Sequence, residues 1–309
     1  MSYIFISIIV PNYNHAPFLK QRLESVYKQT YLNFEVILLD DASTDKSLEI
    51  LQEYKNHPKT SHLIVNQKNS GSPFKQWKKG IELAKGDYIW IAESDDFCEL
   101  TFLEKMTSFF KENSSLGLGY CQTLDVDENG KELLHRIDYT KEFQPNIWES
   151  SFTMKGFKFV DNYLAIKNVI PNASAVLFKR ELVIKDLFSE SLLNMKMCGD
   201  WYFWIQLSLQ TEVGFLAAEL NFFRNHQSVS RNHSNPKIKK RRLFEESVIR
   251  SFLQNMNIYH LKREQKLYQQ WFKLHSFSSI FSSSFYYIKL SKTATFTFLK
   301  QFLEFKIVK

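Results

Sequence analysis

Five carboxylates near the start of the chain have the types and spacing that could do chemistry. They directly follow two apolar segments, FEVILL and IWIA, and are Asp40, Asp41, Glu93, Asp95 and Asp96. If both segments are parallel strands of one sheet, their carboxyl ends share the edge where α/β folds bind ligands. Turns favour Asp for conformational reasons alone. This preference could explain one acidic cluster, but it explains two clusters on the same edge less well.

Carboxylates at such an edge have two uses in nucleotide chemistry. One can accept the N3–H of uracil or an N–H of guanine, because an ionised carboxylate only accepts hydrogen bonds. Others can hold Mg²⁺ or Mn²⁺, hard cations that prefer oxygen ligands and stabilise charge on a leaving diphosphate. The sequence has neither a G-x-G-x-x-G fingerprint after its first apolar segment nor a P-loop motif. The pattern therefore indicates a nucleotide-diphosphate donor site of another type.

The segments that would position these carboxylates alternate between short apolar runs and segments with apolar residues at helical spacing. Short apolar runs predict buried strands, and apolar residues at helical spacing predict the helices between them. Repeated strand–helix units predict an α/β fold whose mostly parallel sheet is covered by helices on both faces. The predicted strands are residues 3–10, 34–39, 62–65 and 87–92, and the predicted helices are 18–27, 43–54 and 74–84.

The chain beyond residue 122 is less regular. Residues 123–170 are polar and aromatic and predict loops beside the sheet. Residues 172–183 predict a strand followed by the start of a helix, and 198–209 predict an aromatic-rich helix. The segment 213–226 predicts two short strands.

Composition limits the class of protein. The chain has 309 residues and 44% hydrophobic content, enough for one large or two modest domains with a sizeable core. Its three cysteines are far apart in the sequence, which argues against a disulfide framework and fits a reducing compartment. The apolar segment at residues 3–10 is too short to span a bilayer. We therefore expect a cytoplasmic protein.

Charge is unevenly distributed along the chain. Residues 236–309 hold 15 Lys and Arg against 4 Glu and no Asp, a net charge of +11, whereas the preceding residues carry −4. The basic residues are mixed with aromatic ones, a pattern typical of helices lying on an anionic membrane surface. Basic faces are also common where they are merely solvated. Nucleic-acid binding is disfavoured, because no recognised module frames these residues.

The order and spacing of the motifs resemble a known family. SIIVPNYNHAPFLKQRLESVYKQTYLNFEVILLDDASTDKS and KGIELAKGDYIWIAESDDF are similar to the donor-binding half of the family 2 glycosyltransferases, over about residues 4–112. The resemblance implies a GT-A fold, a nucleotide-diphosphate sugar as donor and Mn²⁺ or Mg²⁺ as cofactor. It also implies roles for five residues: Pro11 and Tyr13 line the nucleotide pocket, Asp41 pairs with the base, and Asp95 and Asp96 share ribose contact and metal coordination.

Two positions depart from the family pattern. Glu93 stands where many members carry the first Asp of the acidic motif. Gln76, Trp77 and Lys78 stand where the family often shows Ala-Arg-Asn. The donor contact of that Arg is expected from Lys75 or Lys78, or is missing.

The segment MCGDWYFWIQLS is similar to the one where family members place an acidic general base, which implies that role for Asp200. A positioned carboxylate removes the proton of an acceptor hydroxyl as that oxygen attacks. The alternative is that Asp200 only caps the helix beginning at Trp201. Trp201 and Trp204 are consistent with a wall for a sugar face and equally with core packing.

The segment FFRNHQSVSR resembles a family segment of the type R-x-H-x-x-S, although Ser228 follows His226 one residue early. The resemblance implies that His226 binds the metal or a phosphate and that Arg224 offsets phosphate charge. The alternative for His226 is an ordinary surface position.

These observations predict a metal-dependent glycosyltransferase of cell-surface polysaccharide biosynthesis, and the resemblance to family 2 implies that it is inverting. A nucleotide-diphosphate sugar, with a UDP-sugar favoured, would donate to a hydroxyl of a glycan or lipid-linked acceptor. A GT-A domain would cover residues 1–234, with a donor half at 1–122 and an acceptor half at 123–234. A basic, aromatic-rich helical region at 235–309 would attach the enzyme to the inner face of the cytoplasmic membrane.

Two alternatives remain open from the sequence. A sugar-phosphate nucleotidyltransferase shares a similar sheet, but normally shows a glycine-rich, basic signature after its first strand, and PNYNHAPF has no glycine. A non-catalytic nucleotide- or sugar-binding relative is the other.

Overall fold

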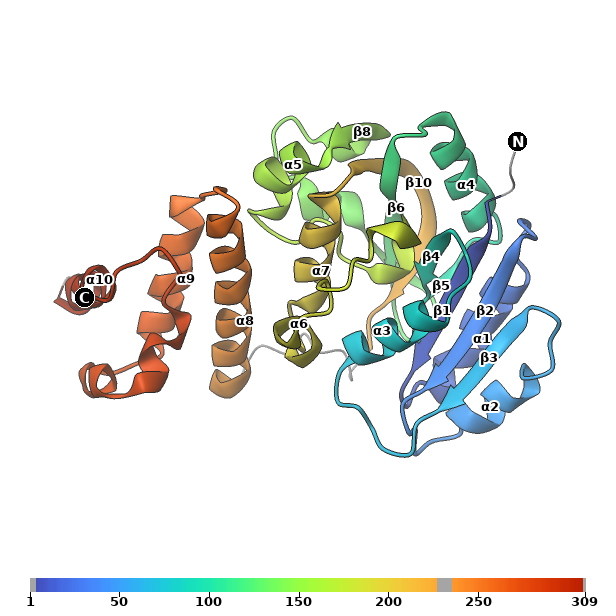
Figure 1. Cartoon of the computed structure of the whole chain (residues 1–309), viewed down its shortest axis with the longest axis horizontal. Coiled ribbons are helices and arrows are strands. Elements are labelled where there is room, and N and C mark those ends of the chain that lie inside the picture. The colour runs from blue at the N-terminus through green and yellow to red at the C-terminus, as the bar shows by residue number, and fades with distance from the viewer. Residues whose placement is uncertain (1–3, 227–234, 308–309) are drawn as a thin grey trace.

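The computed structural model describes residues 4–226 and 235–307 (Figure 1). Its centre is one mixed sheet with the strand order β3-β2-β1-β4-β9-β6-β10-β5, to which β7 adds beside β6 and β8 beside β10. The strands are β1 Ile6–Asn12, β2 Phe34–Asp40, β3 Thr60–Val65, β4 Tyr88–Ile91, β5 Phe97–Cys98, β6 Leu116–Val126, β7 Glu132–His135, β8 Phe152–Lys155, β9 Val176–Lys179 and β10 Glu212–Arg224.

The first half of the sheet confirms the predicted alternation. Strands β1 to β4 are parallel, and successive residues of β1 and β2 face opposite sides, so both faces must be covered. Helices α1, α2 and α4 pack on one face and α3 on the other. The helices of this half are α1 Ala16–Tyr27, α2 Ser47–Glu53, α3 Pro73–Leu83 and α4 Phe102–Glu112.

The second half differs from the sequence prediction in several elements. Residues 123–170, expected to be loops beside the sheet, instead supply the end of β6 and the strands β7 and β8, which pair within the sheet. The segment expected to form two short strands is one long strand, β10, whose register against β6 shifts at three places, so irregular pairing replaces a break. The segment 172–183 forms β9 and then a single 3-10 turn at Arg180–Leu182, not a longer helix.

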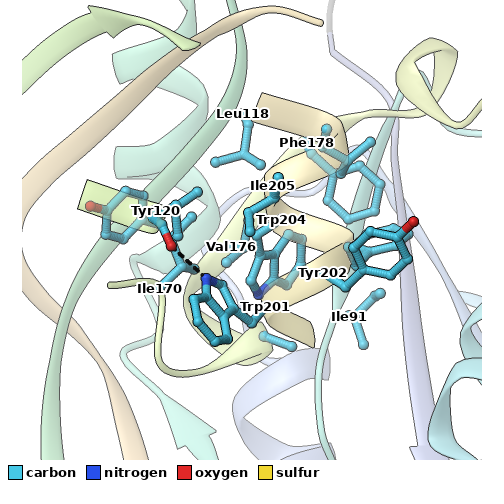
Figure 2. Packing of buried hydrophobic residues seen from close by; sticks show 14 of the residues in the cluster. Ile91, Leu118, Tyr120, Ile170, Val176, Phe178, Trp201, Tyr202, Trp204 and Ile205 are labelled. Carbon is cyan, nitrogen blue, oxygen red and sulfur yellow. Dashed lines mark hydrogen bonds between the residues drawn. The ribbon is translucent and has the colours of Figure 1, made fainter. Parts of the chain in front are cut away.

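Aromatic side chains fill the core of this half (Figure 2). Four of them, Trp201, Tyr202, Phe203 and Trp204, come from α7 Gly199–Ser208, the aromatic-rich helix that the sequence predicted. Trp204 is fully buried and packs against Trp77 and Phe178, which makes it a core residue and excludes it as a wall for a sugar. The short helices α5 Gly156–Phe159 and α6 Glu190–Asn194 flank α7.

The C-terminal region is helical, as predicted, and consists of α8 Pro236–Asn255, α9 Leu261–Lys273 and α10 Thr295–Ile307. Helix α8 adds Ile249 and Leu253 to the main core, while its Leu243 joins a second apolar cluster formed mostly by α9 and α10. These two helices lie on the side of α8 away from the sheet (Figure 1). Among the described residues, no helix is both long and apolar enough to cross a membrane.

Candidate active site

The carboxyl ends of β1, β2 and β4 meet at one edge of the sheet, so the acidic residues that follow β2 and β4 share that edge, as expected. Asn12 at the end of β1 donates to Asp40 (2.9 Å) and to the Ser43 hydroxyl (3.1 Å). Asp40 also accepts from the backbone N–H of Ser43 (2.9 Å). Asp40 therefore fixes the turn after β2, and this turn presents the next residue, Asp41.

Asp41 is 4% exposed and organises the loop between β3 and α3. Its Oδ1 accepts from Asn66 (2.6 Å), the backbone N–H of Ser70 (2.9 Å) and Gln76 (2.9 Å), and its Oδ2 accepts from the Ser70 hydroxyl. The exposed Lys75 closes the same loop by donating to the Ser70 carbonyl (3.0 Å). Base pairing by Asp41 and a donor contact by Lys75 stay predictions.

Pro11 and Tyr13, the two predicted pocket residues on β1 and the turn after it, differ in exposure. Pro11 is buried in β1 opposite Leu39. Tyr13 lies just beyond the strand with 44% of its surface exposed. Tyr13 thus offers a ring at the sheet edge, whereas Pro11 shapes the backbone beneath it.

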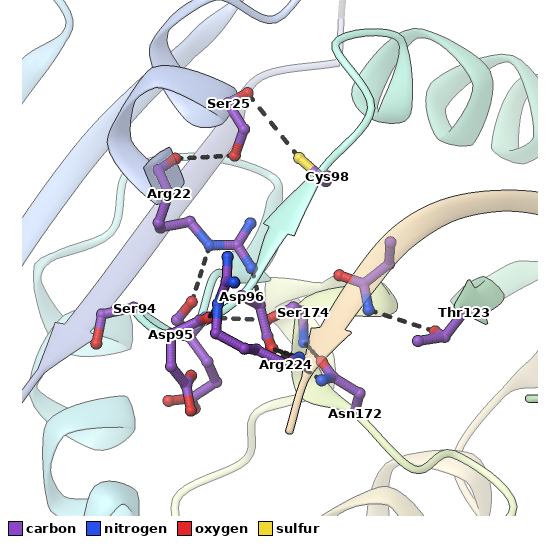
Figure 3. Close-up of polar contacts among 12 residues, drawn as sticks. Arg22, Ser25, Ser94, Asp95, Asp96, Cys98, Thr123, Asn172, Ser174 and Arg224 are labelled. Carbon is purple, nitrogen blue, oxygen red and sulfur yellow. Dashed lines mark hydrogen bonds and ion pairs between the residues drawn. The ribbon is translucent and has the colours of Figure 1, made fainter. Parts of the chain in front are cut away.

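Asp96 is 1% exposed and is surrounded by donors from three parts of the chain (Figure 3). Its Oδ2 accepts from Asn172 (2.9 Å) and the Ser174 hydroxyl (2.7 Å), and its Oδ1 accepts from the backbone N–H of Arg224 (3.0 Å). The buried Arg22 guanidinium lies 3.9 Å away. Burial, and then the charge of Asp95, raise the pKa of Asp96 to about 6, against the opposing effect of Arg22.

Asp95 belongs to a different cluster from Asp96. One ligand atom each from His15, Asp95 and His226 lie within 4.8 Å of one another, and we call these three residues the His–Asp–His cluster. His226 Nε2 is 3.0 Å from Asp95 Oδ2, and His15 Nδ1 is 2.8 Å from the Ser94 hydroxyl. The structure thus brings His226 beside Asp95, while Asp96, the other expected metal ligand, does not join them. Metal binding by Asp95 and His226 stays a prediction.

The electrostatics of the cluster favour metal-binding protonation states. Burial lowers the pKa of His15, with the charge of Asp95 opposing the shift and that of His226 adding to it. Burial alone would raise the pKa of Asp95, but the His226 hydrogen bond and the two histidine charges outweigh it, so that pKa is lowered. A neutral imidazole and an ionised carboxylate are the forms that bind metals.

Glu93, where the family motif usually begins with Asp, points its carboxyl at α3. Its Oε1 accepts from the indole N–H of Trp77 at 2.8 Å. Burial, and then the charge of Asp95, raise the pKa of Glu93 to about 8. Trp77 is the residue in place of the family's Arg, so the two departures from the family pattern contact each other.

Arg224 is 1% exposed and holds backbone around the site. Its guanidinium donates to the carbonyls of Asp95 (2.8 Å), Asp127 (3.1 Å) and Glu128 (2.8 Å) and to Gln21. These contacts make Arg224 a positioning residue. The expected offset of phosphate charge by Arg224 stays a prediction. Ser228 and the rest of residues 227–234 lie outside the described residues.

Asp200 lies in the first turn of α7 and accepts from the Asn168 side chain at 3.0 Å. It lines a cavity of about 550 Å³ beside α8 and α9. The cap residue of α7 is Cys198, not Asp200. Trp201 also lines this cavity, with only 7% of its surface exposed, and donates its indole N–H to the Leu164 carbonyl.

Sequence reasoning missed several residues of the site. His15 follows the first strand on the ligand edge, and that position alone could have signalled a metal ligand. Arg22, Asn172 and Ser174 give no such signal. Arg22 lies within a predicted helix, and helical periodicity does not predict that an arginine is buried. Asn172 and Ser174 lie in a segment predicted only as a strand. Their role depends on contacts with Asp96 across 74 to 78 positions of sequence.

The fold and the edge site define a class of enzyme. The family model described as Glycosyl transferase family 2 matches residues 7–186, so the chain belongs to this family and is a glycosyltransferase. The family expected from PNYN, Asp41 and the Glu93–Asp96 segment is therefore confirmed, and a nucleotidyltransferase is disfavoured.

Named relatives are consistent with that class. An uncharacterized glycosyltransferase of Methanocaldococcus jannaschii is 26% identical over 81% of this chain and 80% of its own. The poly(ribitol-phosphate) beta-glucosyltransferase of Bacillus spizizenii is 38% identical, over 36% of this chain and 18% of that enzyme.

Solved structures show the same GT-A fold. Staphylococcus aureus TarS 1-349 in complex with UDP-GlcNAc aligns with a TM-score of 0.61 at 19% identity, covering 98% of this chain and 80% of that one. The Pyrobaculum calidifontis mannosyltransferase PcManGT, in complex with GDP-Man and Mn²⁺, aligns with a TM-score of 0.54 at 15% identity, covering 100% and 87%.

The two neighbouring aspartates are expected to respond differently to truncation. Asp96→Ala should lower the free energy of unfolding by about 3–5 kcal/mol, because the buried Arg22 would lose its ion-pair partner. Asp95→Ala is the matched control, with a side chain 18% exposed, and should cost about 1 kcal/mol. Urea unfolding followed by circular dichroism measures both. Equal losses for the two variants would contradict a structural role for Asp96.

Proposed function

We propose that this glycosyltransferase transfers a sugar from a nucleotide-diphosphate donor, with a UDP-sugar favoured, to an acceptor hydroxyl with inversion. The observation that carries the proposal is the His–Asp–His cluster at the same sheet edge as Asp41 and Tyr13. TarS, similar in fold, binds UDP-GlcNAc. Inversion is what membership of family 2 implies, and it requires one displacement at the anomeric carbon.

A divalent cation fits the His–Asp–His cluster. Two imidazole nitrogens and one carboxylate oxygen form a mixed donor set, whereas Mg²⁺ favours oxygen ligands alone. The set therefore favours Mn²⁺ over Mg²⁺. The hydrogen bond between His15 Nδ1 and Ser94 orients that ring, as the second hydrogen bond of a metal-bound histidine does. When bound, the ion would neutralise charge on the leaving diphosphate.

The donor nucleotide is assigned to the edge formed by β1 and β2. We place the base against Asp41, whose Oδ2 accepts one hydroxyl and retains capacity for an N–H, with Tyr13 and Pro11 lining the pocket. Lys75 lies on the same loop and supplies positive charge near it. Asp95 and His226 would hold the ion, while Asp96 supports the backbone beneath them.

Asp200 is proposed as the general base. Its carboxylate borders an open cavity of a size suited to a substrate, and Asn168 orients it. The proton of the acceptor hydroxyl would pass to Asp200 as the oxygen attacks the sugar, and the bond to the nucleotide diphosphate would break.

A role in cell-surface polysaccharide synthesis, with a glycan or lipid-linked acceptor, is supported by relatives named for teichuronic acid and chondroitin synthesis. Peripheral membrane attachment is supported by large apolar side chains exposed on the C-terminal region. Those at least half exposed are Leu261 68%, Phe277 52%, Phe281 88%, Tyr287 63%, Phe296 79% and Ile307 77%. Lysines of the same region would meet anionic headgroups.

Nucleotide binding is expected to depend on the metal. UDP with Mn²⁺ at about 100 times the dissociation constant should stabilise the protein by about 2.7 kcal/mol, and UDP with Mg²⁺ should stabilise it less. Asp95→Asn and His226→Ala should lose the Mn²⁺-dependent part, while His62→Ala on β3 keeps it. Thermal unfolding measures all three variants. An unfolding midpoint that UDP raises equally without metal would refute the cluster as a metal site.

The base assignment predicts a loss of rate without a loss of donor binding. Asp200→Asn should lower transfer by about 10²–10⁴-fold, because the acceptor hydroxyl loses its proton acceptor, and should still bind UDP. The control is Asp186→Asn, an exposed carboxylate outside the cavity. Release of UDP from a panel of UDP-sugars with glycan acceptors measures transfer. If Asp200→Asn retains near wild-type rates, the base lies elsewhere.

Membrane attachment is tested by vesicle sedimentation. Phe281→Asp combined with Phe296→Asp should weaken binding to phosphatidylglycerol vesicles roughly tenfold or more, because each buried Phe contributes about 1.5–3 kcal/mol. Leu32→Asp, at a residue 70% exposed before β2, is the control and should bind as wild type does. Binding unaffected by the double substitution would remove the membrane proposal.

A further inference from the structure

The cavity beside Asp200 is open, large and lined by residues far apart in sequence. Its volume of about 550 Å³ is in the range of small-molecule sites. One wall is the first turn of α7, a second is α8, a third is α9, and residues 166–171 with the 3-10 turn Arg136–Thr140 close the rest. It is separate from the His–Asp–His cluster, none of whose members lines it.

The lining is strongly cationic. Two carboxylates, Asp200 and Glu246, face it. Six basic side chains from four parts of the chain face it as well, and they are Arg136, Lys167, Arg242, Arg250, Arg263 and Lys266.

Ion pairs neutralise only part of this charge. Glu246 pairs with Arg242 (2.9 Å) and Arg250 (2.6 Å), so two cations share one carboxylate. Glu142, behind the wall, is likewise shared by Lys167 (2.9 Å) and Arg263 (3.1 Å).

Arg136 pairs with Asp125 (2.5 Å), and Lys266 is exposed on α9. Six basic groups thus face four carboxylates, counting Asp200, which leaves two positive charges in excess.

One segment connects the cavity with the sheet edge. Asn168 donates to Asp200 in the cavity wall, and four residues later Asn172 donates to Asp96 beneath the metal cluster. A molecule in the cavity would therefore contact Asp200, the proposed base, beside the segment that also holds Asp96.

We propose that this cavity is the acceptor site and that its cationic lining binds a phosphate group of the acceptor. The inference rests on the proposed function, since it assigns the acceptor class of that same site. Arginine presents a planar fork of donors that matches phosphate oxygens, and several cations on different walls suit a group with more than one negative charge. The phosphate can belong to a polyol phosphate or to a lipid-linked sugar.

The test uses the full chain saturated with UDP and Mn²⁺, so that the donor site is filled, and isothermal titration calorimetry. Glycerol 3-phosphate and farnesyl phosphate are the probes, and glycerol and glycerate are the uncharged and carboxylate comparisons. We expect at least one phosphate probe to bind and both comparisons to bind at least tenfold more weakly. Glycerol 3-phosphate binding indicates a polyol phosphate, and binding of farnesyl phosphate alone indicates a lipid-linked one.

Variants locate the probe. Arg263→Ala with Lys266→Ala should weaken phosphate-probe binding at least tenfold, and Lys266→Ala alone, at an exposed position, severalfold. Lys262→Ala is the matched control, since Lys262 is exposed on α9 outside the cavity lining.

Glycerate binding as tight as glycerol 3-phosphate, or variants equal to wild type, would overturn the assignment. No phosphate-probe binding while UDP still binds would also overturn it. Failure of UDP itself to bind would instead refute the proposed function.

Discussion

The buried carboxylate of Asp96 is the contact on which the rest of the site depends. It joins Arg22 of α1, the backbone of Arg224 at the end of β10, and the segment holding Asn172 and Ser174. A carboxylate taken out of water costs several kcal/mol unless donors surround it. Because these donors come from both halves of the fold, satisfying one charge fixes how the halves meet and where Asp95 and His226 lie.

A second constraint is the pair formed by Trp77 and Glu93. Trp77 donates to Glu93 from α3, and its ring packs against Phe203 and Trp204 of α7. The aromatic core therefore sets the position of α7, and with it Asp200, relative to the acidic segment. Trp77 in place of the family's Arg and Glu93 in place of its Asp are matched, because the longer Glu side chain reaches the indole N–H. An Asp at position 93 would leave that N–H farther from its acceptor.

Local pattern predicted the first half of the fold well, because continuous apolar runs and amphipathic helices depend on neighbouring residues alone. The sequence predicts two short strands where the structure has the single strand β10, because the irregular pairing of β10 with β6 depends on a distant partner. The same limit applies to the site. Asp95 and Asp96 look equivalent in sequence, and only contacts with residues 22, 172 and 174 distinguish the buried carboxylate from the one beside the histidines.

Helix α8 contributes to two apolar cores at once. Ile249 and Leu253 pack with the sheet and α7, and Leu243 packs with α9 and α10. A chimera joined before α8 would strip apolar surface from the transferase core, and one joined after it would leave Leu243 against a foreign partner. The C-terminal helices are thus not a detachable module.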